Sequence, residues 1–591
     1  AASSLTLGNI RVGATTNLAV TNTLAANGNA AYQDKLAVAA TSANARLAFV
    51  NPADIAAAAA GNVGVTAAVA GSLTGTVDLA LTSKALTGTG LNDLGLAAQS
   101  FAVTGAAYDY AVAAVTNRDL DFGNVRKGGV LAAQSLAFAN TLVTDAAFQD
   151  QLLVATSANN AKLTATGALV TAGTSADLTV AASTATAGTL ADALTVALTS
   201  KAAAAGLSDK DLGTLNVVVT GGVYDYAQAD FSAAPLAFGN VRKGATGLTR
   251  TVGVTNTVVT NAAFQDSLDV TGTVANAKLS ASALVNTAAG LTGDVTVTAS
   301  TALAGSLADT LNLAFVSNAN GVAGLTGQAL TGGTVAITGA VYDLANAAVT
   351  PTLTFGNVRT GTVGAVGVTN AAITSAQYQD SLDVTATSAN ARLALTNPAT
   401  IAADAAGDVT VRAATAGSLD ATLSVGLVSN SRGVTGLDDT ALAAQSVTVT
   451  GAAYDLARAT LASTTLALGN VRTGTQTGVA VTNTVTTSAD FQDSLDVVAA
   501  TANGNLLLTN PANILAGQTR AVGVKANLAG SLDATVALAL GSNTNGVTGL
   551  VGETLAGQSI AVTGAAYDYA VAAVTNRELA FGNIRKGGVL A

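Results

Sequence analysis

The chain has 591 residues, too many for one ordinary domain, and its formal net charge is −10 at pH 7. Only 10% of the residues are charged and the basic ones are scattered, so we expect no nucleic-acid partner and no affinity for an anionic membrane surface. The absence of cysteine and histidine excludes disulfide scaffolds, Cys/His zinc sites and catalysis by either side chain. We therefore expect neither an enzyme nor a cofactor, and no segment predicts a membrane span.

The first 115 residues contain seven short segments in which apolar residues alternate with small or polar ones. This two-residue period is typical of β-strands, and Gly, Asn, Asp and Asn-Pro turns separate the segments. About seven strands in about 115 residues predict an immunoglobulin-like β-sandwich. The chain is 50% hydrophobic but 4% aromatic, so its cores should consist mainly of small side chains. In chain order the predicted strands are 5–10, 16–22, 35–40, 45–50, 63–70, 75–83 and 99–110.

A ten-residue motif, LDFGNVRKGG at 120–129, returns as LAFGNIRKGG at 579–588. Its first glycine recurs at spacings of 115, 116, 117, 113 and 113 residues, at Gly8, Gly123, Gly239, Gly356, Gly469 and Gly582. This period is much longer than that of a solenoid, so each repeat should be a domain with its own core. The predicted repeats are 1–115, 116–231, 232–348, 349–461 and 462–574, and 575–591 would be the first strand of a sixth.

Other landmarks keep step with this motif, and the whole pattern FGNVR, VTNT, FQDSLDV, AGSL and TGAAYD resembles the choice-of-anchor D type of immunoglobulin-like repeat. Such repeats, related to Hydin-like domains, occur in large secreted bacterial surface proteins. The resemblance implies an all-β tandem array of seven-stranded sandwiches at the bacterial cell exterior. A binding tip should differ in composition from its stalk, and all five repeats look alike, so we favour a structural protein that forms a filament, surface layer or stalk and associates with copies of itself. The alternative is the stalk of an adhesin whose binding tip lies outside this chain.

The Gly-Asn motif has a structural interpretation in every repeat. We expect its aromatic residue to fill the core and its Gly-Asn pair to form a bulge or a strand switch. A phosphate-binding loop would need a helix after the glycines, and a strand is predicted there instead. The motif residues are Phe122, Gly123, Asn124 and Arg126; Phe238, Gly239, Asn240 and Arg242; and Phe355, Gly356, Asn357 and Arg359.

An arginine and an aspartate also recur once per repeat. The arginine closes the motif, and the aspartate ends an aromatic-Gln-Asp triplet, at Asp34, Asp150, Asp266, Asp380 and Asp493. One hypothesis is an Arg–Asp ion pair inside every domain that fixes a loop. The other is a solvated arginine that protects an edge strand from pairing.

A Tyr-Asp pair closes each repeat and should lie at the domain junction, where the tyrosine could pack on the next domain. Calcium at these junctions is an alternative role for the aspartate, although calcium needs six to eight oxygen ligands and few carboxylates are near. The pairs are Tyr108 and Asp109, Tyr224 and Asp225, Tyr342 and Asp343, and Tyr454 and Asp455.

The lone strand predicted at 575–591 has no sheet of its own to join. We expect that the natural polypeptide continues with further repeats. The alternative is that this strand completes the sandwich of a neighbouring molecule, although the first repeat already has a motif strand at 5–10.

Overall fold

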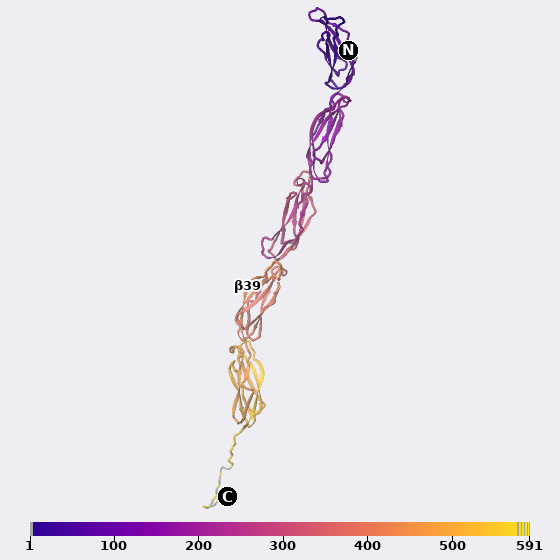
Figure 1. The fold of residues 1–591 in the computed structure, drawn as a ribbon. Helices are drawn as coiled ribbons and strands as arrows, with labels where there is room; N and C mark the ends of the chain where they lie inside the picture. Colours follow the sequence, from indigo (N-terminus) through magenta and orange to yellow (C-terminus); the bar gives the residue numbers. More distant parts are fainter. Residues whose placement is uncertain are drawn as a thin grey trace.

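The computed structural model describes residues 4–575 and, beyond them, residues 578, 580, 582, 583, 586, 587 and 589. Five β-sandwiches follow one another in a line from the N-terminal end of the molecule to the C-terminal end (Figure 1). The predicted all-β tandem array of immunoglobulin-like sandwiches is confirmed. The predicted strand at 575–591 lies largely outside the described residues.

All seven segments predicted in the first repeat form strands. The repeat consists of β1 (Ser4–Arg11), β2 (Thr15–Thr21), η1 (Ala30–Tyr32), β3 (Lys35–Ser42), β4 (Leu47–Val50), β5 (Ala60–Ala67), β6 (Gly71–Ser72), β7 (Gly75–Lys84), β8 (Leu94–Gly95) and β9 (Gln99–Tyr108).

The second and third repeats begin with one additional short strand. The second has β10 (Ala113–Val115), β11 (Asp119–Arg126), β12 (Gln134–Asn140), η2 (Ala146–Phe148), β13 (Gln151–Ser157), β14 (Leu163–Thr166), β15 (Ala168–Val170), β16 (Ser175–Ala182), β17 (Gly188–Thr189), β18 (Asp192–Lys201) and β19 (Lys210–Tyr224). The third has β20 (Ala229–Phe231), β21 (Leu236–Arg242), β22 (Thr249–Asn256), η3 (Ala262–Phe264), β23 (Ser267–Thr273), β24 (Leu279–Ala281), β25 (Ala283–Thr287), β26 (Thr292–Ala299), β27 (Gly305–Ser306), β28 (Asp309–Asn318), β29 (Gln328–Ala329) and β30 (Gly333–Tyr342).

The fourth and fifth repeats follow the same plan. The fourth has β31 (Ala347–Val349), β32 (Thr352–Arg359), β33 (Val363–Asn370), η4 (Ala376–Tyr378), β34 (Ser381–Ser388), β35 (Leu393–Thr396), β36 (Ala405–Ala413), β37 (Gly417–Ser418), β38 (Ala421–Asn430) and β39 (Thr440–Tyr454). The fifth has β40 (Ala459–Leu461), β41 (Thr465–Arg472), β42 (Gln476–Asn483), η5 (Ala489–Phe491), β43 (Ser494–Ala500), β44 (Leu506–Thr509), β45 (Thr519–Ala526), β46 (Gly530–Ser531), β47 (Ala534–Asn543) and β48 (Glu553–Tyr567).

The second repeat shows the topology of each sandwich. One sheet has the order β10-β12-β16-β14, and the facing sheet has the order β11-β19-β18-β13-β15. The first strand of the immunoglobulin fold is thus split between the sheets: β10 is antiparallel to β12, whereas β11 is parallel to β19. We call β10, β20, β31 and β40 the lead strands, β1, β11, β21, β32 and β41 the motif strands, and β9, β19, β30, β39 and β48 the closing strands.

The lead strands lie across the repeat limits drawn from the sequence. Residues 113–115 were assigned to the first repeat, but β10 hydrogen-bonds to β12 of the second. The lead strands β20, β31 and β40 likewise join the sheet of the repeat that follows. A three-residue strand is too short to show a periodic pattern, so no periodic signal marks this boundary.

The Gly-Asn motif forms a bulge where the motif strand meets the closing strand. Gly123 has φ of +67°, and the pairing of β11 with β19 shifts register between Asp121 and Asn124. Opposite it, a Cβ on Gly221 would lie 2.6 Å from the carbonyl oxygen of Gly123. The two glycines therefore allow a close backbone approach that a side chain at Gly221 would prevent.

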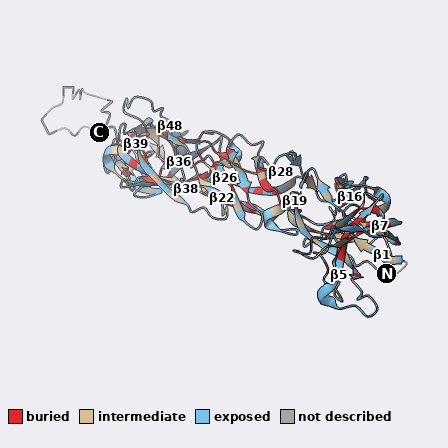
Figure 2. Cartoon of the chain, turned by 90° about the horizontal axis from the view of Figure 1, so that it is seen from above, coloured by how far each residue is buried: buried red, intermediate tan, exposed pale blue. Residues whose placement is uncertain are grey.

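Each repeat has its own core between its two sheets. Buried residues gather in five separate clusters in the described part of the chain, one in each repeat, and Val, Leu and Ala predominate. Figure 2 shows these buried positions inside the sandwiches, with exposed residues around them. The motif side chains Phe122 and Phe238 are buried in their cores, and Phe355 is half-buried against the core of the fourth repeat.

We expect Phe238→Ala to lower the free energy of unfolding of the third repeat by about 3–5 kcal/mol, because it removes a large side chain from a core with few aromatics. Hydrogen exchange read by repeat should show faster exchange in the third core and little change in the others. Val285→Ala, at an exposed position of the same repeat, is the matched control and should change stability by about 0.5 kcal/mol or less. Equal loss of protection in all five repeats would contradict independent cores.

Candidate functional site at the joints between repeats

The motif asparagine and arginine, the aromatic-Gln-Asp triplet and the Tyr-Asp pair meet where one repeat ends and the next begins, and residues 4–575 contain four such joints. At the second joint Asp225, the residue after β19, forms an isolated parallel bridge with the triplet of the third repeat. The Asp225 N–H donates to the carbonyl of Phe264 at 2.9 Å, and the Asp266 N–H donates to the carbonyl of Asp225 at 3.1 Å. The same parallel bridge occurs at all four joints, at Asp109 and Gln149, Asp225 and Gln265, Asp343 and Gln379, and Asp455 and Gln492.

An aromatic pair packs beside each bridge. The tyrosine that ends the closing strand contacts the aromatic residue of the next triplet, with ring centroids 5.3–5.6 Å apart. Burial raises the pKa of Tyr342, with Tyr378 and Asp380 adding to the effect. The tilted and edge-on ring geometries are those that aromatic pairs favour. The pairs are Tyr108–Phe148, Tyr224–Phe264, Tyr342–Tyr378 and Tyr454–Phe491.

The recurring arginine pairs with the recurring aspartate of the next repeat. The sequence hypothesis placed this ion pair inside each domain, whereas the structure places it across each joint. The Arg126 Nη1 atom lies 2.6 Å from Oδ1 of Asp266, and the aspartate side chain is 1% exposed. The alternative, a solvated arginine guarding an edge strand, does not describe these four residues. The remaining pairs are Arg11–Asp150, Arg242–Asp380 and Arg359–Asp493, each at 2.8 Å.

A hydrogen-bond network inside each repeat fixes the position of the aspartate that pairs with the arginine. The Ser317 hydroxyl donates to Oδ2 of Asp266 at 2.6 Å, and Asn256 Nδ2 donates to the Asp266 carbonyl at 2.9 Å. The Ser317 oxygen in turn accepts the N–H of Ala227, which leads into β20, at 2.9 Å. Because the aspartate is buried, the arginine and this serine together compensate its desolvation.

A second contact of each motif strand reaches the turn before the closing strand of the next repeat. Asn124 Nδ2 donates to the carbonyl of Ala323 at 3.1 Å, and Arg126 Nη2 donates to the carbonyl of Thr326 at 2.9 Å. Equivalent bonds from the motif asparagine and arginine occur at the other three joints. Each joint is therefore held at two separated places, the backbone bridge and this turn.

The residue after the motif arginine is a lysine in the second and third repeats and a threonine in the fourth. In each case it contacts the aspartate of the Tyr-Asp pair that closes the same repeat. Lys127 Nζ lies 3.4 Å from Oδ1 of Asp225, and Lys243 makes the same contact with Asp343. In the fourth repeat the Thr360 hydroxyl donates to Oδ1 of Asp455 at 3.0 Å. These contacts lie within one repeat and stabilise the end of its closing strand.

The serine of this network was not among the residues singled out from the sequence. It recurs near the end of the ten-residue strand that pairs antiparallel with each closing strand, at Ser83, Ser200, Ser317, Ser429 and Ser542. Its recurrence at the same place in every repeat is the sequence signal that could have identified it. A single serine does not stand out in a Thr- and Ser-rich β protein, because strand propensity alone accounts for such residues.

The junction aspartates do not form a carboxylate cluster. No group of three or more Asp or Glu side chains placed to hold a metal ion occurs in the described part of the chain. Calcium also takes carbonyl and water oxygens, so calcium at the joints stays a prediction from the sequence. Over the same part of the chain, no helix is long and apolar enough to cross a membrane.

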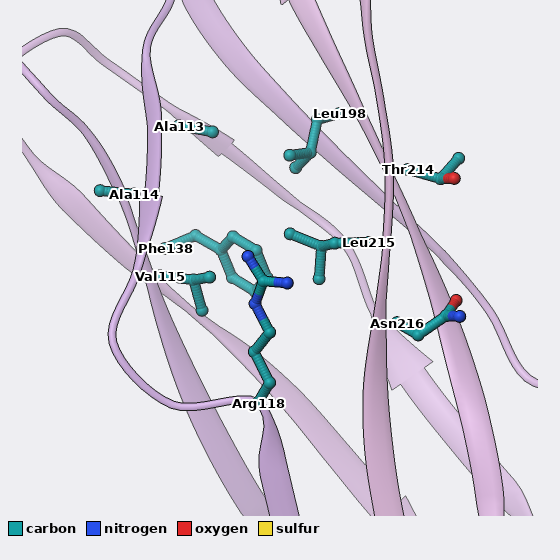
Figure 3. A pocket seen from close by; sticks show the side chains of 9 residues that line it. All are labelled: Ala113, Ala114, Val115, Arg118, Phe138, Leu198, Thr214, Leu215 and Asn216. Carbon is teal, nitrogen blue, oxygen red and sulfur yellow. The ribbon is translucent and has the colours of Figure 1, made fainter.

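A cavity of about 690 Å³ lies between the lead strand and the closing strand of the second repeat (Figure 3). Its walls include Ala113, Val115, Phe138 and Leu215, and Arg118 is the only titratable side chain among the nine that line it. A lone arginine offers no acid–base pair and no nucleophile with its base, so this cavity has no catalytic constellation.

No protein-family model and no curated protein matches the chain. Among solved structures, it is similar to the D1–D4 ectodomain fragment of ICAM-5, with 13% identity over 76% of this chain and 98% of that one, at a TM-score of 0.24. Drosophila N-cadherin EC1–4 has 11% identity over 76% of this chain and 99% of that one, at a TM-score of 0.22. Domains 4–9 of the surface layer protein SbsC have 14% identity over 97% of this chain and 83% of that one, at a TM-score of 0.15. At such values the likeness concerns the fold alone.

We expect Arg242→Ala to weaken the third joint by about 3 kcal/mol, because Asp380 would be left buried without its cation. This is the lower end of the range for a broken buried pair, since the Arg242 side chain is 25% exposed. Hydrogen exchange at the bridge amides Asp343 and Asp380 should accelerate while the two flanking cores stay protected.

Arg412→Ala removes an exposed arginine of the fourth repeat and should leave these amides unchanged. Adding Asp380→Asn to the Arg242→Ala chain should restore part of the protection, because the buried group is then neutral. Unchanged exchange in the single variant would show that the ion pair does not hold the joint.

Proposed function

We propose that this chain is a non-catalytic structural protein of the bacterial cell exterior, working as a rod in a filament, surface layer or stalk. The observation that carries the proposal is the joint. Every pair of neighbouring repeats is connected by a backbone bridge, an aromatic pair and a buried ion pair of the same design.

Such a joint restricts bending in more than one direction. A single flexible linker would let two domains swing, which is the default for domains in one chain. Here the motif arginine and asparagine also donate hydrogen bonds to a turn of the next repeat, at a place separate from the backbone bridge. Bending about the bridge would pull a cation away from a buried aspartate, which is costly.

The composition suits an exposed location. The chain lacks Cys, Met and Trp, so it offers few side chains for oxidative damage outside the cell. The resemblance to choice-of-anchor D repeats points to the same location. Digestion of intact cells by a protease, followed by peptide identification, tests the location: peptides of this chain should be released without cell lysis.

A rod of five repeats should be about 200 Å long, because strands at about 3.3 Å per residue give repeats of roughly 35–45 Å. Small-angle scattering of the purified chain should give an elongated profile of this maximum dimension. A compact globule would rule out the rod.

Replacing Arg126, Arg242 and Arg359 together by Ala should shorten the mean end-to-end distance in electron micrographs, because three joints lose their ion pair. The control is the triple replacement of Arg250, Arg412 and Arg520, which form no ion pair among the described residues. Equal stiffness in both triple variants would show that the ion pairs do not stiffen the rod.

A further inference from the structure

The cavity of the second repeat lies where the fourth and fifth repeats are bridged between their two sheets. In the fourth repeat Gln445 Nε2 of the closing strand donates to the carbonyl of Ala347 in the lead strand, at 3.3 Å. Gln558 makes the same bond to Ala459 in the fifth repeat. The strand register places Leu215 at this position in the second repeat, and a leucine side chain donates no such bond.

The third repeat fills the same space with an aromatic side chain. Phe231 of its lead strand packs on Phe315 with the ring centroids 5.6 Å apart, and it lies over Gly333, where a Cβ would leave it no room. In the second repeat the lead strand has Val115 at the position of Phe231. The smaller side chain leaves the space open as the cavity of about 690 Å³.

One cation reaches into this cavity. In Figure 3 the Arg118 side chain extends toward Phe138 and Leu215, which belong to the apolar floor. Arg118 forms no ion pair among the described residues. An arginine without a carboxylate partner at a cavity favours an anionic ligand. Counted from the motif glycine, the later repeats have uncharged residues at this position, namely Ala234, Pro351 and Thr464.

One wall of the cavity is an open strand edge. The N–H of Val218 in β19 donates to the carbonyl of Arg118 at 2.7 Å, on the side away from β18. Because the direction of these groups alternates along a strand, the N–H and C=O groups of Thr214 and Asn216 point to the same side. The motif strand β11 pairs with β19 only from Val218 onward. The main-chain groups of Thr214 and Asn216 therefore face the cavity without a strand partner among the described residues.

The open edge ends at Arg118, and this determines what it takes. From Val218 onward the edge of β19 is occupied by β11, so an extended segment laid along Thr214 and Asn216 has to end there. A segment antiparallel to β19 would bring its amino terminus to Arg118, and two cations would repel each other. A segment parallel to β19 brings its carboxyl terminus, which a guanidinium binds with two parallel hydrogen bonds.

We propose that the second repeat binds the carboxyl-terminal end of an extended peptide, parallel to β19, with the terminal carboxylate on Arg118. The main-chain groups of Thr214 and Asn216 add the peptide to the sheet as a strand, a mode in which backbone bonds supply affinity and side-chain pockets supply specificity. Every second side chain of the peptide faces the floor at Val115 and Leu215, which selects apolar residues there. This binding activity goes beyond the structural role above and does not depend on it.

The test uses the full chain, immobilised, and a pool of short peptides of randomised sequence, prepared once as free acids and once as carboxyl-terminal amides. Mass spectrometry identifies the peptides that are retained. We expect retention of free acids with apolar residues at alternate positions near the carboxyl end. In fluorescence anisotropy the amide of the best binder should have an affinity about 10-fold or more lower, because Arg118 loses its carboxylate partner.

Two variants connect this preference to the groove. Arg118→Gln should lower the affinity for the free acid about 10-fold or more and leave that for the amide unchanged, so that both forms bind alike. Arg412→Gln, at an exposed position of the fourth repeat, is the matched control and should change neither affinity. Leu215→Gln introduces the glutamine that bridges the fourth and fifth repeats, so the variant should fold and lose binding.

Hydrogen exchange locates the bound peptide. At saturation the amides of Thr214 and Asn216 should exchange more slowly, and the amide of Ser446, which corresponds to Asn216 in the fourth repeat, should not change. Equal retention of acids and amides, a preference for acids that survives Arg118→Gln, or binding that leaves Thr214 and Asn216 unprotected would overturn the proposal. Retention only of peptides with internal carboxylates, or of a uronic-acid oligosaccharide and no peptide, would overturn it as well.

Discussion

The buried aspartate at each joint is the constraint on which the rest of the array depends. A carboxylate in this position is expensive without compensation, and its own repeat supplies only hydroxyl and backbone donors. The missing cation comes from the motif arginine of the preceding repeat. Each sandwich is therefore electrostatically complete at its leading end only when another repeat is docked there, which couples domains whose cores are independent.

This dependence gives the chain a direction. The motif strand and closing strand end at one face of the sandwich, and the triplet and its serine lie at the other. The joining face and the receiving face are different surfaces, so repeats can be added without limit and never close into a symmetric pair. The split first strand serves the same arrangement, because its lead part belongs to the receiving sheet and its motif part ends at the next joint.

Much of the fold could be predicted from the sequence, because alternation and period are local signals. Seven of the nine strands of the first repeat were predicted, as were the core position of Phe122 and the junction position of Tyr108; the two strands that were missed, β6 and β8, have two residues each. The partner of the arginine could not be predicted. Arg126 lies 24 residues before Asp150 and 140 before Asp266, and in a regular repeat both spacings recur equally well. Only the three-dimensional arrangement distinguishes a pair within a repeat from a pair between repeats.

The placement of the two faces also explains how a run of whole repeats can be copied with its joints intact. Because donor and acceptor sit at opposite ends of every repeat, a duplicated run of whole repeats begins with a receiving face and ends with a joining face. The new boundary then meets the same chemistry as the old one, whichever repeats flank it. Residues that contact only their own repeat, such as Lys127 and Thr360, are free to differ along the chain. The arginine, the aspartate and the serine that fixes it have to match a neighbour, and they recur in all five described repeats.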